Sequence, residues 1–224
     1  AGPLPAHVEK ALTYLRQQLS PNIDVVISAP PNGIPGKSAR WLLGREHFEG
    51  FQHLYMCDAD FFICDTKLTA QHLAVCASHD LPHSNVRRWD LTDRASGIQF
   101  MNVPAYFDKV QPHLDYFRRD PRTRDLHNEV LLANLLTAAD IPPPPTITKE
   151  AFDVARPHPG LHLGLLRTHT DVGNYAALWR AYASSVQRVC QSPLFRKVRN
   201  MLVQPLVTTS VDRMCELLTT GKIS

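Results

Sequence analysis

Two carboxylates interrupt an apolar run in the first third of the chain. Residues 53–63 read HLYMCDADFFI, with Asp58 and Asp60 two positions apart. In an extended segment such side chains share a face, and adjacent carboxylates repel each other unless they share a proton or a cation. We therefore expect a strand whose acids hold Mn²⁺ or Mg²⁺, ions that prefer oxygen ligands and also bind phosphate. This short pattern leaves the simpler alternative open, in which the two acids cap amides or are solvated in a turn.

The composition is that of an ordinary globular protein. The chain has 224 residues, 44% hydrophobic and 20% charged, with a net charge of +3 that is too small to predict a nucleic-acid partner. No apolar stretch approaches the ~20 residues of a membrane-spanning helix. No leader is visible, although a processed or trimmed start at Ala1 is left open. The five cysteines form no CxxC pair, which favours reduced thiols and a cytoplasmic location. A peripheral membrane location, or the Golgi lumen for a trimmed chain, are the alternatives.

Hydrophobic periodicity and chain breakers predict alternating strands and helices. We expect strands over residues 23–29, 53–63 and 96–102, and helices over 6–19, 37–43, 68–77 and 128–139. A further helix should open at Pro104, and the tail should hold two or three helices broken near Pro193 and Pro205. Segments 79–95 and 140–160 are expected to be loops. Such alternation is typical of an α/β sandwich with a mainly parallel sheet.

The order of several short motifs resembles one enzyme family. Arg40 lies in a short helix before the acidic strand, and the segments SGIQFMN (96–102), HNE (127–129) and HLGLLR (162–167) follow in order. This arrangement resembles the retaining GT-A fold glycosyltransferases that include glycogenin and bacterial lipopolysaccharide galactosyltransferases. That family has a YaRl helix, a DxD strand, an sGvmliN strand, a DQd helix and an HxxGxxKPW segment. The resemblance covers residues 23–167, but HNE replaces DQD, Arg167 replaces the lysine, and the PW is absent.

The resemblance implies a domain organisation and a metal centre. It implies a GT-A-like, Rossmann-like catalytic domain over residues 1–171, with 172–224 as a C-terminal helical extension. Asp58, Asp60 and His162 would hold Mn²⁺ or Mg²⁺, with His162 binding through a neutral imidazole nitrogen. Taken alone, His162 fits a hydrogen-bonded core histidine better.

The same resemblance implies residues for the substrate and for catalysis. The donor and acceptor would be bound by Lys37, Arg40, Ser96, Gly97, Asn102 and Gly164. The catalytic residues would be Arg167, which stabilises charge on the leaving diphosphate, and Asn128 and Glu129, which orient sugar or acceptor hydroxyls. In an inverting enzyme Glu129 would be the general base. An acid in the first turn of a helix also has a purely structural explanation through the helix dipole, and the two explanations are evenly balanced.

These assignments predict a metal-dependent hexosyltransferase, retaining by resemblance. It would move a sugar from a nucleotide-diphosphate sugar, with a UDP-sugar favoured, to a hydroxyl of a glycan, a lipid-linked glycan or a protein. Two rivals stay open. One is a nucleotidyltransferase on a similar α/β fold, and the other is a glycosyltransferase-like domain that binds a ligand or partner without catalysis.

Three other polar groups have simpler explanations. Residues 32–38 read NGIPGKS, but Pro31 stands where a P-loop requires glycine. The histidines His72, His79 and His83 are separated by the helix breaker Pro82, so we expect solvated loop residues rather than a zinc site. The basic cluster at residues 196–199 is expected to be a solvated helix face, with contact to an anionic membrane surface as the alternative.

Overall fold

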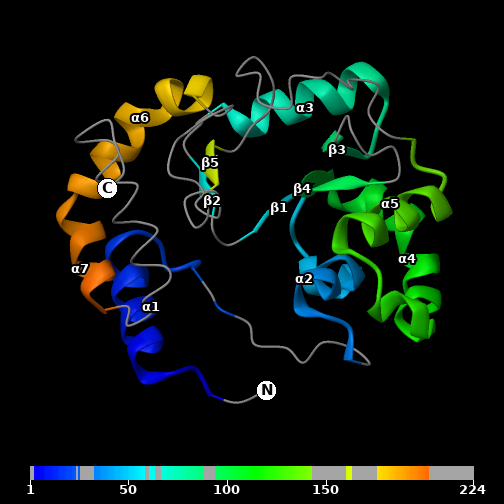
Figure 1. Cartoon of the computed structure of the whole chain (residues 1–224), viewed down its shortest axis with the longest axis horizontal. Coiled ribbons are helices and arrows are strands. Elements are labelled where there is room, and N and C mark those ends of the chain that lie inside the picture. Colours follow the sequence, from blue (N-terminus) through cyan, green and yellow to red (C-terminus); the bar gives the residue numbers. More distant parts are fainter. Residues whose placement is uncertain are drawn as a thin grey trace. The chain divides into compact units, whose positions relative to one another are not determined.

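The computed structural model describes residues 3–23, 25, 33–58, 61–63, 67–87, 94–142, 160–162 and 176–201 (Figure 1). The chain divides into two compact units. One comprises residues 1–29, 60–65 and 158–224, and the other residues 30–59 and 66–157. The expected boundary at residue 171 lies outside the described residues and stays a prediction. Within the described ranges, no helix is both long and apolar enough to cross a bilayer.

The second unit is organised around a three-stranded antiparallel sheet. Its strands are β1 (His53–Met56), β3 (His83–Arg87) and β4 (Ala95–Asn102), in the order β1-β4-β3. The α/β class is confirmed, but the expected parallel pairing does not occur among the described strands. Only a short segment joins β3 to β4, whereas parallel neighbours need a crossover of about a dozen residues or more.

Two helices bury their apolar faces against one side of this sheet. They are α4 (Val103–Arg119) and α5 (Asn128–Ala138), both in contact with β4 (Figure 1). Their fully buried side chains form the core together with Met101 and comprise Val110, Leu114, Leu131, Leu132 and Leu135. The expected helices at Pro104 and at 128–139 are thus confirmed. Short helical turns complete this side: α2 (Gly36–Ala39), η2 (Arg40–Leu42), η3 (Arg45–Phe48) and η4 (Pro121–Arg124).

The opposite side of the sheet packs against helix α3 (Leu68–His79), which contacts β3 (Figure 1). His72 of this helix stacks on Phe100, with ring centroids 5.1 Å apart and planes 7° apart. Tyr55 and Phe100 are directly opposed across β1 and β4, so their rings share this face. Helices therefore cover both faces, as expected for a layered α/β unit.

The first unit is described by its own elements. They are α1 (Ala6–Gln18), β2 (Phe61–Ile63), β5 (Gly160–His162), α6 (Ala176–Gln191) and α7 (Pro193–Met201). Strands β2 and β5 pair antiparallel, and α7 contacts both α1 and α6. The Lys197 ammonium lies 4.4 Å from the centroid of the Tyr14 ring, a cation–π contact between α7 and α1. The two helices of the tail and the break at Pro193 agree with expectation.

Two strand predictions were wrong. Residues 53–63 do not form one strand, because β1 and β2 belong to different sheets and the acidic residues fall between them. Strand β3 lies inside the expected loop 79–95; its sequence HSNVR lacks the apolar alternation that marks a strand. Most of the predicted strand 23–29 lies outside the described residues.

Candidate functional site

The structure brings together two of the predicted site residues, Arg40 and Asp58. The Arg40 Nη1 group donates a hydrogen bond to Asp58 Oδ1 at 2.5 Å. This contact joins η2 to Asp58, which lies two residues after the end of β1. Arg40 was expected to contact the donor, and Asp58 to bind a metal. In the structure each is the other's ion-pair partner.

Local structure holds Arg40 in place. Trp41 and Leu42, which follow it in η2, are buried. The Arg118 guanidinium donates two hydrogen bonds to the Leu42 carbonyl at 3.0 and 2.8 Å. The Arg40 Cζ atom lies 4.4 Å from the centroid of the Trp41 ring. Stacking and the ion pair together restrict the guanidinium more than either contact alone. Sequence reasoning missed Trp41, although its position beside Arg40 was a signal.

The ion pair lies at the edge of the unit rather than in its core. The Arg40 side chain is 16% exposed and that of Asp58 is 41% exposed. Nε and Nη2 of Arg40 are nevertheless buried, with no hydrogen-bond partner in the described part of the chain. Buried donors without partners are costly, and they are common where a water molecule or a ligand oxygen completes the hydrogen bonding. Asp58 keeps a second carboxylate oxygen, since a carboxylate accepts at two oxygens.

The other two predicted metal ligands are less completely described. Asp60 lies outside the described residues. His162 is the last residue of β5, where it is paired with Phe61 of β2, the residue that follows Asp60 in the sequence. The described residues contain no group of three histidine, cysteine or acidic side chains that could hold a metal. The metal site therefore stays a prediction.

The predicted substrate residues fall into different surroundings. Lys37 is exposed on α2, and Ser96 and Gly97 lie near the start of β4. Asn102 has a structural function, because its Oδ1 accepts a hydrogen bond from the Ala105 amide at 3.0 Å and caps α4. Gly164 and Arg167 lie outside the described residues.

Asn128 and Glu129 begin helix α5. His127 caps this helix, with Nδ1 accepting from the Glu129 amide at 3.3 Å. The Glu129 side chain is only 12% exposed, and its Oε2 lies 4.0 Å from His127 Nδ1. An acidic side chain in the first turn interacts favourably with the helix dipole. The position of Glu129 is therefore compatible with a purely structural function at the start of α5. The catalytic function of this pair stays a prediction.

A buried polar cluster between α3 and the sheet was not anticipated. His72 Nδ1 lies 2.8 Å from the Ser84 hydroxyl. Both residues are at least 96% buried, and His83 is fully buried. Burial lowers the pKa of His72 and of His83 to about 4, because desolvation disfavours the imidazolium. The expectation of solvated loop histidines at these two positions was wrong. The cluster is closed to substrate, so a structural function fits it.

Comparison with known proteins adds no family to this picture. No protein-family model, curated protein or solved structure matches the chain. A carboxylate that is held by a stacked guanidinium and is partly open to solvent is suited to binding a cation and the anionic group that accompanies it.

Proposed function

We propose that this protein is a metal-dependent glycosyltransferase that uses a nucleotide-diphosphate sugar, preferably a UDP-sugar, and a hydroxyl acceptor. The observation that carries the proposal is the ion pair between Arg40 and Asp58. These residues occupy the positions of the helix and DxD motifs in the family that the sequence resembles. A random match of short motifs gives no reason for them to meet in space.

The strand pairing supports the same proposal. Strand β1, which leads to Asp58, lies beside β4, which carries the SGIQFMN segment. Strand β2, which follows Asp60, is paired with β5, which ends at His162. Segments far apart in the sequence, each with its own motif, are thus neighbours in pairs. Each unit, taken by itself, thus pairs two segments that carry motifs of the family.

The donor atoms of Asp58 fit a hard divalent cation. One oxygen accepts from Arg40, and the partly exposed carboxylate has a second oxygen for a ligand. Asp58, Asp60 and His162 would hold Mn²⁺ or Mg²⁺, which would neutralise the diphosphate of the leaving group.

The chain's own residues would supply the remaining functions. Arg40 orients the Asp58 carboxylate, and its two donors without a partner among the described residues would bind a ligand oxygen. Arg167 and Lys37 would add positive charge where the diphosphate leaves, because preorganised charge is commonly the largest catalytic contribution. Glu129 and Asn128 would orient hydroxyl groups of donor or acceptor.

Ligand-induced stabilisation tests the donor class. We expect one nucleotide-diphosphate sugar in a panel to raise the melting temperature with Mn²⁺ and to raise it far less without the metal. A ligand at 100 times its Kd should stabilise the fold by about 2.7 kcal/mol. Nucleoside triphosphates in the same panel test the nucleotidyltransferase alternative.

The control for this experiment is a second acid that is also paired with an arginine. Asp108 accepts from Arg45 at 2.9 Å and is more exposed than Asp58. Asp108→Asn should leave the Mn²⁺-dependent shift intact, whereas Asp58→Asn should abolish it. Failure of every donor to stabilise the wild-type protein would contradict the proposal.

A further inference from the structure

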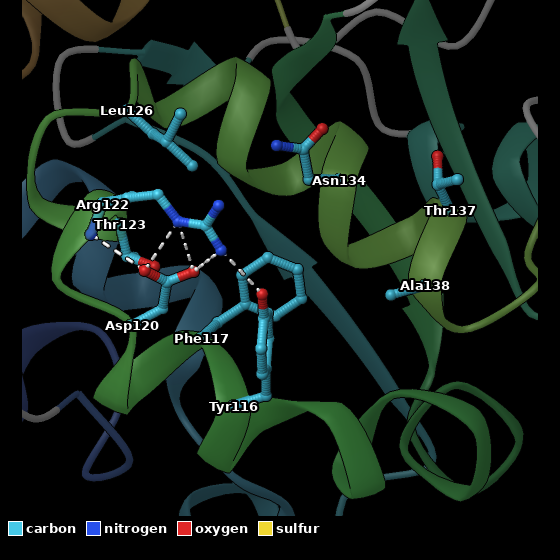
Figure 2. Close-up of a pocket in the computed structure, with 9 residues that line it drawn as sticks. All are labelled: Tyr116, Phe117, Asp120, Arg122, Thr123, Leu126, Asn134, Thr137 and Ala138. Atoms are coloured by element: carbon cyan, nitrogen blue, oxygen red, sulfur yellow. Dashed lines mark hydrogen bonds and ion pairs between the residues drawn. The ribbon is translucent and has the colours of Figure 1, made fainter.

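A second site is formed by the end of α4, the turn η4 and one face of α5. These elements line a pocket of about 440 Å³ in the second unit (Figure 2). Its lining combines apolar side chains, including Phe117 and Leu126, with polar ones at the rim. The pocket involves none of the residues of the proposed transferase site. Its volume suits a ligand of the size of one or two sugar rings.

The positive charge of this pocket is internally neutralised. Arg122 donates through Nε to both Asp120 oxygens at 3.0 Å and through Nη2 to Oδ2 at 2.7 Å. These hydrogen bonds lower the pKa of Asp120 to about 2, so the carboxylate is ionised at any physiological pH. The pair therefore has no net charge, and a neutral ligand is favoured over a phosphate.

Hydrogen-bonding capacity remains after that pair is formed. Arg122 Nη1 and the side-chain amide of Asn134 have no hydrogen-bond partner within the described ranges, and Asn134 lies across the pocket from Arg122 (Figure 2). The Tyr116 hydroxyl accepts from Arg122 Nη2 at 3.0 Å and keeps its own proton to donate. The rim thus offers both donors and acceptors, fixed in planar groups. Hydroxyl groups, each a donor and an acceptor, match such a set.

An aromatic face completes the pocket. Tyr116 is 57% exposed and stands beside Arg122 (Figure 2). Its ring is held edge-on against Phe117, with centroids 5.3 Å apart. An exposed but fixed ring gives a flat apolar surface at low entropic cost. Pyranose rings have apolar C–H faces and a hydroxyl periphery, and they therefore match both the ring and the rim.

From this arrangement we infer that the pocket lined by Tyr116, Arg122 and Asn134 binds a neutral hexose residue of a glycan. The Tyr116 ring contacts a face of the sugar, and Arg122 and Asn134 bind its hydroxyls. Binding at this site needs neither a metal nor a nucleotide. The inference therefore stands or falls separately from the proposed transferase activity.

Saturation-transfer NMR with defined sugars tests the inference. The probes are maltotriose, cellotriose, mannotriose and chitotriose. Inorganic phosphate serves as an anionic control ligand, and adenosine serves as a planar aromatic control ligand. All are measured without Mn²⁺ or nucleotide sugar. We expect one trisaccharide to bind with Kd on the order of 1 mM.

Matched variants separate the contribution of the Tyr116 ring to sugar binding from that of its hydroxyl. Tyr116→Ala and Asn134→Ala should each weaken binding at least about tenfold, while Tyr116→Phe should retain most of it because the ring remains. Arg119→Ala is the control, since Arg119 is an exposed arginine of the same helix that bonds to Asp115. Thermal melts confirm that each variant is folded. The inference is overturned if no trisaccharide binds, if phosphate or adenosine binds instead, or if Tyr116→Ala binds as the wild type does.

Discussion

The pair Arg40–Asp58 and the cluster His72–Ser84 are both polar, yet they handle charge in opposite ways. The first is an ion pair whose acid is 41% exposed. The second is a neutral hydrogen bond in the core, where burial lowers the pKa of His72 to about 4. Solvent access accounts for the difference, because a charge is tolerated where water or a partner is available and is suppressed where neither is.

The comparison also separates function from architecture. Arg40 and Asp58 keep unused hydrogen-bonding groups at the edge of the unit, as a binding site requires. His72 Nδ1 and the Ser84 hydroxyl are hydrogen-bonded to each other, His72 Nε2 has no partner among the described residues, and both side chains are buried away from solvent. Substitutions in the core should therefore change stability, whereas substitutions in the ion pair should change ligand binding and leave stability nearly unaltered.

The largest effect on stability is expected at Phe100. This ring is 2% exposed and lies in stacking contact with His53 and His72. Phe100→Ala should lower the free energy of unfolding by about 3–5 kcal/mol, through lost burial and the cavity left behind. Urea denaturation at pH 7 measures this loss. Leu73→Ala, at a partly exposed position of α3, is the control and should cost far less.

Acid should destabilise the fold through His72 and His83. Both have a folded pKa of about 4, below the value of about 6.5 in an unfolded chain. Between these values the unfolded chain binds more protons, so the free energy of unfolding falls as pH drops from about 6.5 to 4. The loss should approach about 3 kcal/mol for each histidine. Urea denaturation at pH 7, 6, 5 and 4 provides the measurement.

A variant isolates the contribution of one histidine. In His72→Asn the amide can still meet the Ser84 hydroxyl, but the titrating ring is gone. Its stability should be lower at pH 7 and should depend less steeply on pH than that of the wild type. An identical slope in both proteins would show that His72 is not held neutral by burial.

A smaller effect is expected at Asn102. This side chain caps α4 by accepting from the Ala105 amide, and loss of an N-cap costs about 1 kcal/mol. Asn102→Ala should lower the unfolding free energy by about this amount, while Asn102→Asp should retain the cap. If both variants were fully stable but lost donor binding, Asn102 would belong to the substrate site rather than to the helix start.

The smallest effect on stability is expected from the ion pair. Because Asp58 is 41% exposed, solvent screens the attraction, and a double-mutant cycle with Arg40→Gln and Asp58→Asn should give a coupling below about 1 kcal/mol. The coupling should fall in high salt. The same cycle on Arg45 and Asp108 calibrates it. A coupling of several kcal/mol would show that Asp58 contributes to stability as a buried group does, and it would contradict the contrast between the two regions.

Helices were the elements most predictable from sequence. The start of α4 could be placed by Pro104 and that of α5 by its long apolar pattern, because helix signals are local. Sheet pairing is not local, and neither the antiparallel order β1-β4-β3 nor the strand HSNVR could be found by periodicity. The run 53–63 looked like one strand because both its halves are apolar.

The candidate site was predictable in part. The motif order selected Arg40 and Asp58, but nothing in it indicated that they would form an ion pair. The burial of His72 and His83 was missed because Pro82 indicated a solvated loop, whereas the His72 ring stacks on Phe100 and bonds to Ser84 through one ring nitrogen. The pocket at Tyr116 was missed because its residues come from two helices and a turn.

Donor hydrolysis tests the central claim most directly. The wild type, Asp58→Asn and Asp108→Asn proteins are incubated with the donor that gives the largest Mn²⁺-dependent melting shift, and the released nucleoside diphosphate is quantified with Mn²⁺ and with EDTA. We predict slow release that requires Mn²⁺, falls at least about 100-fold in Asp58→Asn and is unchanged in Asp108→Asn. Release that is equal in all three proteins, or that persists in EDTA, would contradict a metal centre at Asp58 and the transferase proposal built on it.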